Sequence, residues 1–118
     1  MKRTTIVTAK ILEHYAELIE RGIKHYEVRS ESLDGIDAIH LVSAETGEDL
    51  ATYEVLRTLC FTRDEDEKVM PLAQATPEQF YGLFPLPCDG GPEMLWAAEL
   101  GSRTTPDALV APEKAELK

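Results

Sequence analysis

The clearest pattern in the chain is a helical repeat of apolar positions near the N-terminus. Apolar residues recur three and four positions apart at Ile11, Leu12, Tyr15, Leu18 and Ile19. This spacing predicts a helix with one buried face. Thr8 can cap such a helix, so we expect it to begin near Ala9. Gly22 follows the last apolar residue, where glycine commonly ends a helix in the left-handed conformation. The pattern therefore predicts a long N-terminal helix.

Strand patterns lie on both sides of this helix. Residues 4–8 are β-branched throughout, which favours a short first strand. Apolar and polar residues then alternate, or apolar residues dominate, in four segments, at residues 24–29, 36–42, 51–61 and 94–100. Each of these predicts a strand. Arg57 interrupts the apolar face of the third segment, which indicates either a β-bulge or a strand that leaves the core there.

A second, shorter helix is predicted after residue 75. Thr76 is a good capping residue, Pro77 suits the first helical position, and Gln79 completes a capping box. This helix should stop before Pro85. Residues 64–67 are all acidic, and we interpret them as a solvated loop.

The predicted order is strand, helix, three strands, helix, strand. Short strands at hairpin spacing, with helices between them, favour an α+β barrel of about five or more strands over a parallel α/β sheet. A chain of 118 residues is long enough for one domain. Beyond Gly101 the composition turns to Pro, Ala, Lys, Glu and Thr without periodicity. We therefore expect one domain over residues 1–101 and a disordered tail over residues 102–118.

The charge balance disfavours several classes of partner. Twelve Lys and Arg stand against 22 Asp and Glu, for a formal net charge of −10. Binding of long duplex DNA depends on cations that neutralise phosphates, and basic membrane-surface binding needs the same excess. Neither is expected, whereas a local basic pocket could still hold one nucleotide or the end of a short RNA. The sequence leaves the oligomeric state open.

The cysteines and histidines do not form a metal-binding pattern. Cys60 and Cys88 stand 28 positions apart, and the three histidines lack metal-ligand spacing. We expect no metal and no cofactor. The N-terminus lacks the apolar stretch of a signal peptide, and no segment approaches the length of a membrane span. These features predict a cytoplasmic protein.

One group of charged residues could carry chemistry. Glu27 and Arg29 stand two apart in a predicted strand, so their side chains share a face about 6.5–7 Å apart. His25 shares that face, and Lys24 precedes it in the turn. Arg29 could bind a carboxylate, a phosphate or a base edge, and Glu27 could accept a hydrogen bond from an exocyclic amine. Partial desolvation near Arg29 would lower the pKa of Lys24, as a nucleophile or general base requires. The alternative is a surface pair of Glu27 and Arg29 beside a solvated Lys24.

The segment from Tyr15 to Lys24, running into Glu27 and Arg29, resembles the hallmark of ASCH domains, an aromatic-led helix that ends in G-x-K-x-x-E-x-R. The motif matches at Gly22, Lys24, Glu27 and Arg29. Weaker likeness extends over about residues 5 to 100, and includes the predicted strands that begin near Gly35 and Met94.

The resemblance implies a PUA-like β-barrel with a cleft between the first helix and the sheet. The family is associated with RNA and nucleic-acid binding, and includes a small bacterial amidohydrolase that acts on N4-acetylcytidine. In such an enzyme the lysine corresponding to Lys24 would act as nucleophile or base, beside Arg29. That enzyme has threonine at the position of Glu27, and its further catalytic glutamate has no counterpart that we can place here.

Three hypotheses follow. The leading one is a binding module for a nucleoside, a nucleotide or a short single-stranded RNA, with ligand contacts from Lys24, Glu27, Arg29, His25 and Tyr15. In this hypothesis Arg29 and Lys24 hold the anionic part of the ligand, and Glu27 fixes its orientation. The alternative is an amidohydrolase for an acylated nucleoside, with Lys24, Glu27 and Arg29 as catalytic residues. The third is an acidic protein-interaction module, which the composition allows and no motif marks.

Overall fold

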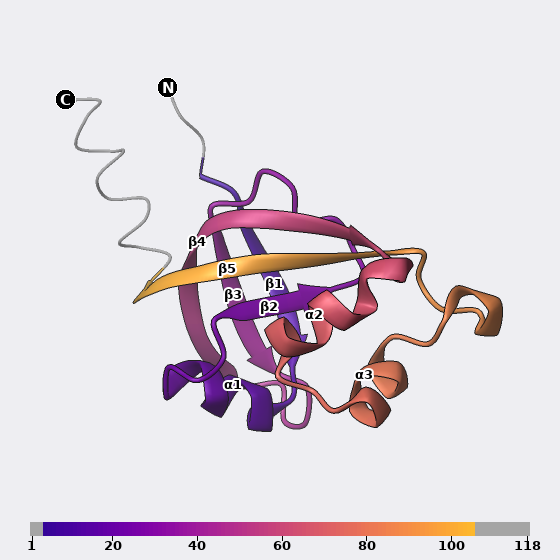
Figure 1. Ribbon diagram of the computed structural model, residues 1–118. Helices are drawn as coiled ribbons and strands as arrows, with labels where there is room; N and C mark the ends of the chain where they lie inside the picture. Colours follow the sequence, from indigo (N-terminus) through magenta and orange to yellow (C-terminus); the bar gives the residue numbers. More distant parts are fainter. Residues whose placement is uncertain (1–3, 106–118) are drawn as a thin grey trace.

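The computed structural model describes residues 4–105. Five strands, three α-helices and two 3₁₀ turns make up this part of the chain (Figure 1). In chain order they are β1 (Ile6–Ile11), α1 (Glu13–Glu20), β2 (Tyr26–Arg29), β3 (Ala38–Ser43), β4 (Asp49–Thr62), η1 (Arg63–Glu65), α2 (Asp66–Ala73), α3 (Pro77–Leu83), η2 (Pro87–Asp89) and β5 (Met94–Thr104).

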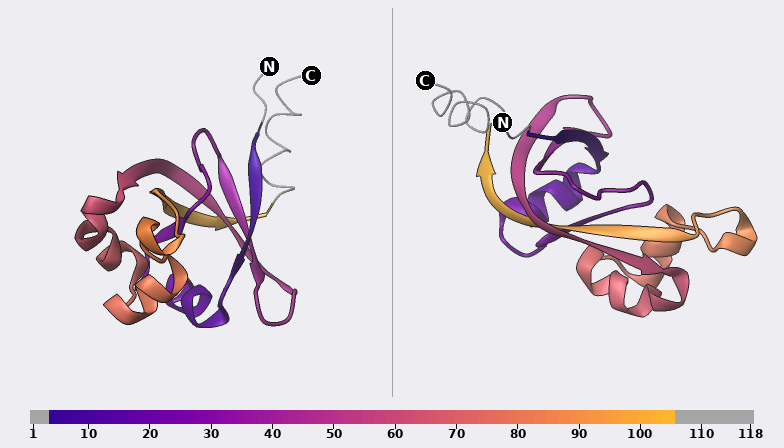
Figure 2. Two further views of the ribbon diagram at one scale, coloured as in Figure 1. Left: turned by 90° about the vertical axis from the view of Figure 1, so that its right-hand side faces the viewer. Right: turned by 90° about the horizontal axis from the view of Figure 1, so that it is seen from above.

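The strands form one sheet in the order β1-β3-β4-β5-β2. Strand β1 pairs with β3 in parallel, and the other neighbours are antiparallel. The long strands β4 and β5 bend strongly, so the sheet curls into a half-barrel (Figure 2). The register of β4 against β5 shifts between Tyr53 and Val55 and between Val55 and Arg57, which confirms the predicted bulge. The predicted α+β class and the count of five strands are also confirmed.

Two groups of buried side chains form the core. Helix α1 contributes Tyr15 and Ile19 to the first group, where they join Ile39 and Leu41 of β3 and Tyr53 of β4. The four-residue spacing of Tyr15 and Ile19 places both on one side of the helix. The predicted apolar face of this helix is therefore the face that packs on the sheet.

The second group joins α2 and α3 to the other half of the sheet. Val69 of α2 and Phe80 of α3 are fully buried against Val28 of β2 and against Leu95 and Ala97 of β5. This packing places the end of α2 beside β2, and so beside the residues of the predicted site.

The prediction of a long N-terminal helix is wrong. Helix α1 has eight residues and begins at Glu13, and the preceding segment from Ala9 to Ile11 belongs to β1. Ala9 and Ile11 are buried because β1 pairs with the distant strand β3. Thr8 lies within β1 and caps no helix. The helical spacing was real only from Tyr15 onward, and long-range backbone pairing decided the rest.

The interpretation of residues 64–67 as a solvated loop is also wrong. They span the end of η1 and the start of α2, a helix that the sequence pattern did not predict. Asp66 is buried and pairs with Arg63. An acidic run looks uniformly hydrophilic in the sequence. Asp66 differs from its acidic neighbours only because Arg63 pairs with it in the folded protein.

Other predictions made from short sequence patterns are confirmed. Helix α3 begins as predicted, with Thr76 and Gln79 forming a reciprocal capping box and Pro77 in the first turn. Gly22 follows α1 with φ of +75°, the left-handed conformation that glycine adopts most readily. Strand β5 continues through Gly101, where we expected the domain to end, as far as Thr104. From residue 106 on, the predicted tail lies outside the described residues.

No helix among residues 4–105 is long and apolar enough to cross a membrane. Both cysteines are free and exposed.

Candidate functional site

The predicted site residues line one cavity of about 310 Å³. Its walls come from the end of β1, from α1, from β2 and the residues after it, and from the ends of α2 and α3. The lining residues used below are Lys10, Leu12, Tyr15, Lys24, Glu27, Arg29, Glu31, Ala73, Leu83 and Phe84. The structure therefore brings Lys24, Glu27, Arg29 and Tyr15 together, and the alternative of a solvated surface pair is wrong.

Lys24 is held at the cavity by the turn that follows α1. Its backbone N–H donates to the carbonyl of Leu18, which closes the end of the helix. Its side chain is buried, with 3% exposure, and Nζ donates to the carbonyl of Ala73 in α2 at 3.1 Å. Nζ also lies 5.5 Å from the centre of the Tyr15 ring. No ion pair to Lys24 exists among residues 4–105, so this amine is an unusual buried group.

Glu27 points from β2 into the same cavity and is also buried, with 5% exposure. Its Oε2 atom accepts a hydrogen bond from Nη1 of Arg29 at 3.4 Å. This contact is longer than a typical charge-assisted hydrogen bond, so it satisfies Glu27 only in part.

Burial shifts the pKa values of both groups toward their neutral forms. Desolvation lowers the pKa of Lys24, and the charge of Glu27 opposes this effect. Desolvation likewise raises the pKa of Glu27, against the charges of Lys24 and Arg29. An amine of lowered pKa and a carboxyl group of raised pKa in one cavity can donate, accept or exchange protons, which is typical of functional sites.

Arg29 stands at the partly exposed side of the site, with 22% side-chain exposure. Nη1 donates to the carbonyl of Lys10 in β1 at 2.6 Å, so Arg29 ties β2 to β1, which lies at the other edge of the sheet. Nε donates to Glu31 at 2.9 Å. Arg29 is thus held by several protein oxygens before any ligand arrives.

His25 does not join the group. Strand β2 begins one residue later, at Tyr26, and His25 is exposed and absent from the cavity lining. The predicted strand began too early, because the paired residues of β2 start at Tyr26.

Sequence analysis missed several lining residues. Glu31 carries no motif, although its position two residues after Arg29 continues the polar alternation of the strand. Ala73, Leu83 and Phe84 come from helices that are distant in sequence. Nothing local to those residues marks them as part of this cavity.

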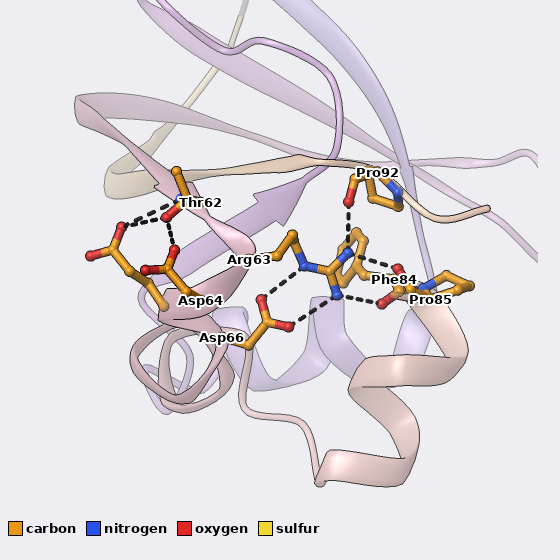
Figure 3. A network of polar contacts seen from close by, with 8 residues as sticks. Thr62, Arg63, Asp64, Asp66, Phe84, Pro85 and Pro92 are labelled. Atoms are coloured by element: carbon orange, nitrogen blue, oxygen red, sulfur yellow. Dashed lines mark hydrogen bonds and ion pairs between the residues drawn. The ribbon is translucent and has the colours of Figure 1, made fainter. Parts of the chain in front are cut away.

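A buried ion pair supports the wall that carries Phe84. The Arg63 guanidinium lies at the centre of a set of acceptors in Figure 3, and pairs with Asp66 at 2.9 and 3.1 Å. It also donates to the carbonyls of Phe84, Pro85 and Pro92 at 2.7–2.8 Å. These contacts attach the end of α3 and the loop before β5 to the start of α2.

Among the described residues, no group of three or more His, Cys, Asp and Glu is placed to hold a metal ion.

Comparison with solved structures shows which known fold this architecture is similar to. No protein-family model and no curated protein matches the chain. The crystal structure of ASCH from Zymomonas mobilis superposes with a TM-score of 0.64 at 15% sequence identity. The superposition covers 80% of this chain and 66%, just under two thirds, of that protein. This is an ASCH-like fold.

A mutant of the same Zymomonas mobilis protein superposes equally well, with a TM-score of 0.64 at 15% identity, over 85% of this chain and 75% of the mutant. The resemblance to ASCH domains is thereby confirmed for the fold. In this ASCH-like fold the cavity with Lys24, Glu27 and Arg29 lies between the first helix and the sheet, where the resemblance implied a cleft.

Proposed function

We propose that this protein binds a nucleoside, a nucleotide or the end of a short single-stranded RNA in the cavity beside α1. The observation that supports the proposal is the pair of buried polar groups, Lys24 and Glu27, that face a cavity with largely apolar walls. Small-ligand sites are typically apolar cavities into which a small number of polar groups converge. A cavity of about 310 Å³ lies at the lower end of the size range of such sites.

The chemistry of the two buried groups suits the edge of a base. A nucleobase presents carbonyl oxygens and exocyclic amines side by side. Lys24 can donate to a carbonyl, and Glu27 can accept from an amine. Leu12 and Phe84 offer apolar surface to the faces of the ring. The acidic surface of the whole chain favours a small or short ligand over a long duplex.

Calorimetric titration of the four ribonucleosides and of short single-stranded RNA tests this proposal. A hydrogen bond to a charged group contributes about 1.5–3 kcal/mol, so Glu27→Gln and Lys24→Met should each weaken binding about tenfold or more. Glu48→Gln is the matched control, since Glu48 is exposed and lies outside the cavity lining. Absence of binding by every ligand, or equal binding by all variants, would refute the proposal. Hydrolysis of an acylated nucleoside and the acidic interaction module would then be the remaining hypotheses.

A second candidate function is hydrolysis of an acylated nucleoside. The observation in its favour is the lowered pKa of Lys24, which makes the neutral, proton-accepting amine available nearer neutral pH. In this scheme Lys24 takes a proton from the water that attacks the acyl carbon and then gives it to the departing amine of the base, so that the C–N bond breaks and acetate and the free nucleoside are released. Wild-type protein should release acetate from N4-acetylcytidine, and Lys24→Met should abolish release even at substrate concentrations high enough to offset its weaker binding. No release by the wild type would eliminate this candidate.

A further inference from the structure

The geometry around Arg29 bears on which ligands the cavity accepts. Every nitrogen of the guanidinium lies within 3.4 Å of a protein oxygen. Nε and Nη2 lie 2.9 and 2.8 Å from Oε1 of Glu31, and Nη1 lies 2.6 Å from the carbonyl of Lys10 and 3.4 Å from Glu27. The edge of the guanidinium that would form a bidentate contact with a phosphate or a carboxylate is occupied by Glu31.

Glu31 is itself held in place. The hydroxyl of Ser30 donates to its Oε2 atom at 3.3 Å. Burial alone would raise the pKa of Glu31, but hydrogen bonds from Arg29 and the charge of Arg29 together lower it. Glu31 is therefore ionised at neutral pH and stands at the cavity as a fixed negative charge.

The charges at the cavity then balance. Two basic groups, Lys24 and Arg29, are held by contacts within the site, and two acidic groups, Glu27 and Glu31, lie beside them, so their formal charges cancel. Lys10, the remaining cation of the lining, is an exposed residue whose charge is screened by water and salt. Apart from the exposed Lys10, the cavity lining within residues 4–105 has no cation beyond those matched by Glu27 and Glu31, and the bidentate edge of Arg29 that a phosphate site would use is occupied.

We propose that Glu31 is a specificity-determining residue that makes this cavity select uncharged ligands and exclude phosphate-bearing ones. The inference rests on the proposed function and narrows it to nucleosides and to RNA ends whose phosphates stay outside the cavity. It replaces the role that the sequence suggested for Arg29, that of holding an anion. Arg29 acts instead as a positioning residue that holds Glu27 and joins β2 to β1. A phosphate that approached Arg29 would meet the carboxylate of Glu31 at the same edge, and like charges at such distances repel.

The test compares cytidine and adenosine with their 5′-monophosphates in calorimetric titrations. Wild-type protein should bind each nucleoside more tightly than its monophosphate. Glu31→Gln and Glu31→Ala free the Nε edge of Arg29, so each should shift the affinity ratio toward the monophosphate by about tenfold. Glu31 is about half exposed, at 54% of the side chain, so neither substitution should prevent folding.

Glu48→Gln is the matched control, because it removes the same charge from an exposed position outside the cavity. It should leave the affinity ratio within about twofold of wild type, since long-range effects of one surface charge are screened. A wild-type preference for the monophosphates would overturn the inference, and so would an unchanged ratio in both Glu31 variants. Loss of all nucleoside binding by the wild type has a different meaning, because it refutes the proposed function and this inference with it.

Discussion

Replacement of Arg63 by alanine should be among the most destabilising single changes in this protein. The Arg63 side chain is 7% exposed and that of its partner Asp66 is 5% exposed. The substitution leaves the carboxylate of Asp66 buried without its cation. It also removes the donors of three backbone carbonyls, on Phe84, Pro85 and Pro92.

The expected loss of unfolding free energy follows from the burial of the ion pair. Removing one partner of a buried ion pair costs about 3–5 kcal/mol, because the remaining charge stays desolvated. The carbonyls of the loop can recover some hydrogen bonds to water as the loop loosens, so we expect a total within this range. Small domains have about 5–15 kcal/mol of stability, so the change removes a large part of it.

Urea titration measures the effect, with the fluorescence of Trp96, the single tryptophan, and far-ultraviolet circular dichroism as parallel probes. With an m value of about 1.5 kcal/mol/M, the midpoint should fall by about 2–3 M. Removing Arg63 and Asp66 together should cost less than the sum of the single changes, because no unpaired charge then remains.

Arg57→Ala is the matched control. Arg57 pairs with Glu99 at 2.8 Å, as close as the pair of Arg63, but its side chain is 60% exposed. Water and salt compete for such a pair, so the midpoint should stay near that of wild type. If Arg63→Ala and Arg57→Ala shifted the midpoint equally and slightly, the claim that burial makes the Arg63 network important would be refuted.

Three further predictions concern the site and the packing. Burial raises the pKa of Glu27 in the folded protein above its value in the unfolded chain, which is about 4.3. The stability that protonated Glu27 contributes is therefore fully present below a pH of about 4.3, and it is lost as the pH rises through the pKa of the folded state. Glu27→Gln should remove this loss, so its stability relative to wild type should grow between pH 4 and pH 7; a constant difference in urea titrations would contradict the burial effect. Gly91→Ala should destabilise by about 1–3 kcal/mol, because its Cβ would lie 1.7 Å from the carbonyl oxygen of Pro85. Gly82→Ala, with open space around it in α3, should instead stabilise by up to about 1 kcal/mol, and thermal melts that ranked the two alike would argue against this loop geometry. Phe80→Ala should cost about 3–5 kcal/mol by urea titration, because its ring is fully buried, and a cost below 1 kcal/mol would show that the second core group is loosely packed.

Features decided within a few residues could be predicted from the sequence. The capping box of Thr76 and Gln79 forms between residues three apart, and Gly22 adopts the backbone conformation that its lack of a Cβ allows. The alternation from Tyr26 to Arg29 placed Glu27 and Arg29 on one side of a strand, where the structure has them. In each case the stabilising contact, or the steric preference, is contained in the local segment.

Features that depend on residues distant in the sequence could not be predicted from the sequence. The segment from Ala9 to Ile11 fits a helical pattern, but its backbone pairs with β3, about thirty residues away. The acidic run around Asp66 looks solvated until Arg63 and the loop before β5 enclose it. The choice between helix and strand, or between buried and solvated charge, was decided by hydrogen bonds whose partners the local sequence does not contain.

The candidate site likewise has features that the local sequence predicts and features that depend on distant residues. Its motif residues were identifiable because Lys24, Glu27 and Arg29 lie close together in sequence. Whether they met in a sheltered cavity depended on the carbonyl of Ala73, 49 residues from Lys24, and on the carbonyl of Lys10, 19 residues from Arg29. The sequence by itself determined which charged groups the site contains. The tertiary structure decided which of them are buried and which are already neutralised, because burial and charge pairing are properties of the enclosed space and not of the segment that supplies the residues.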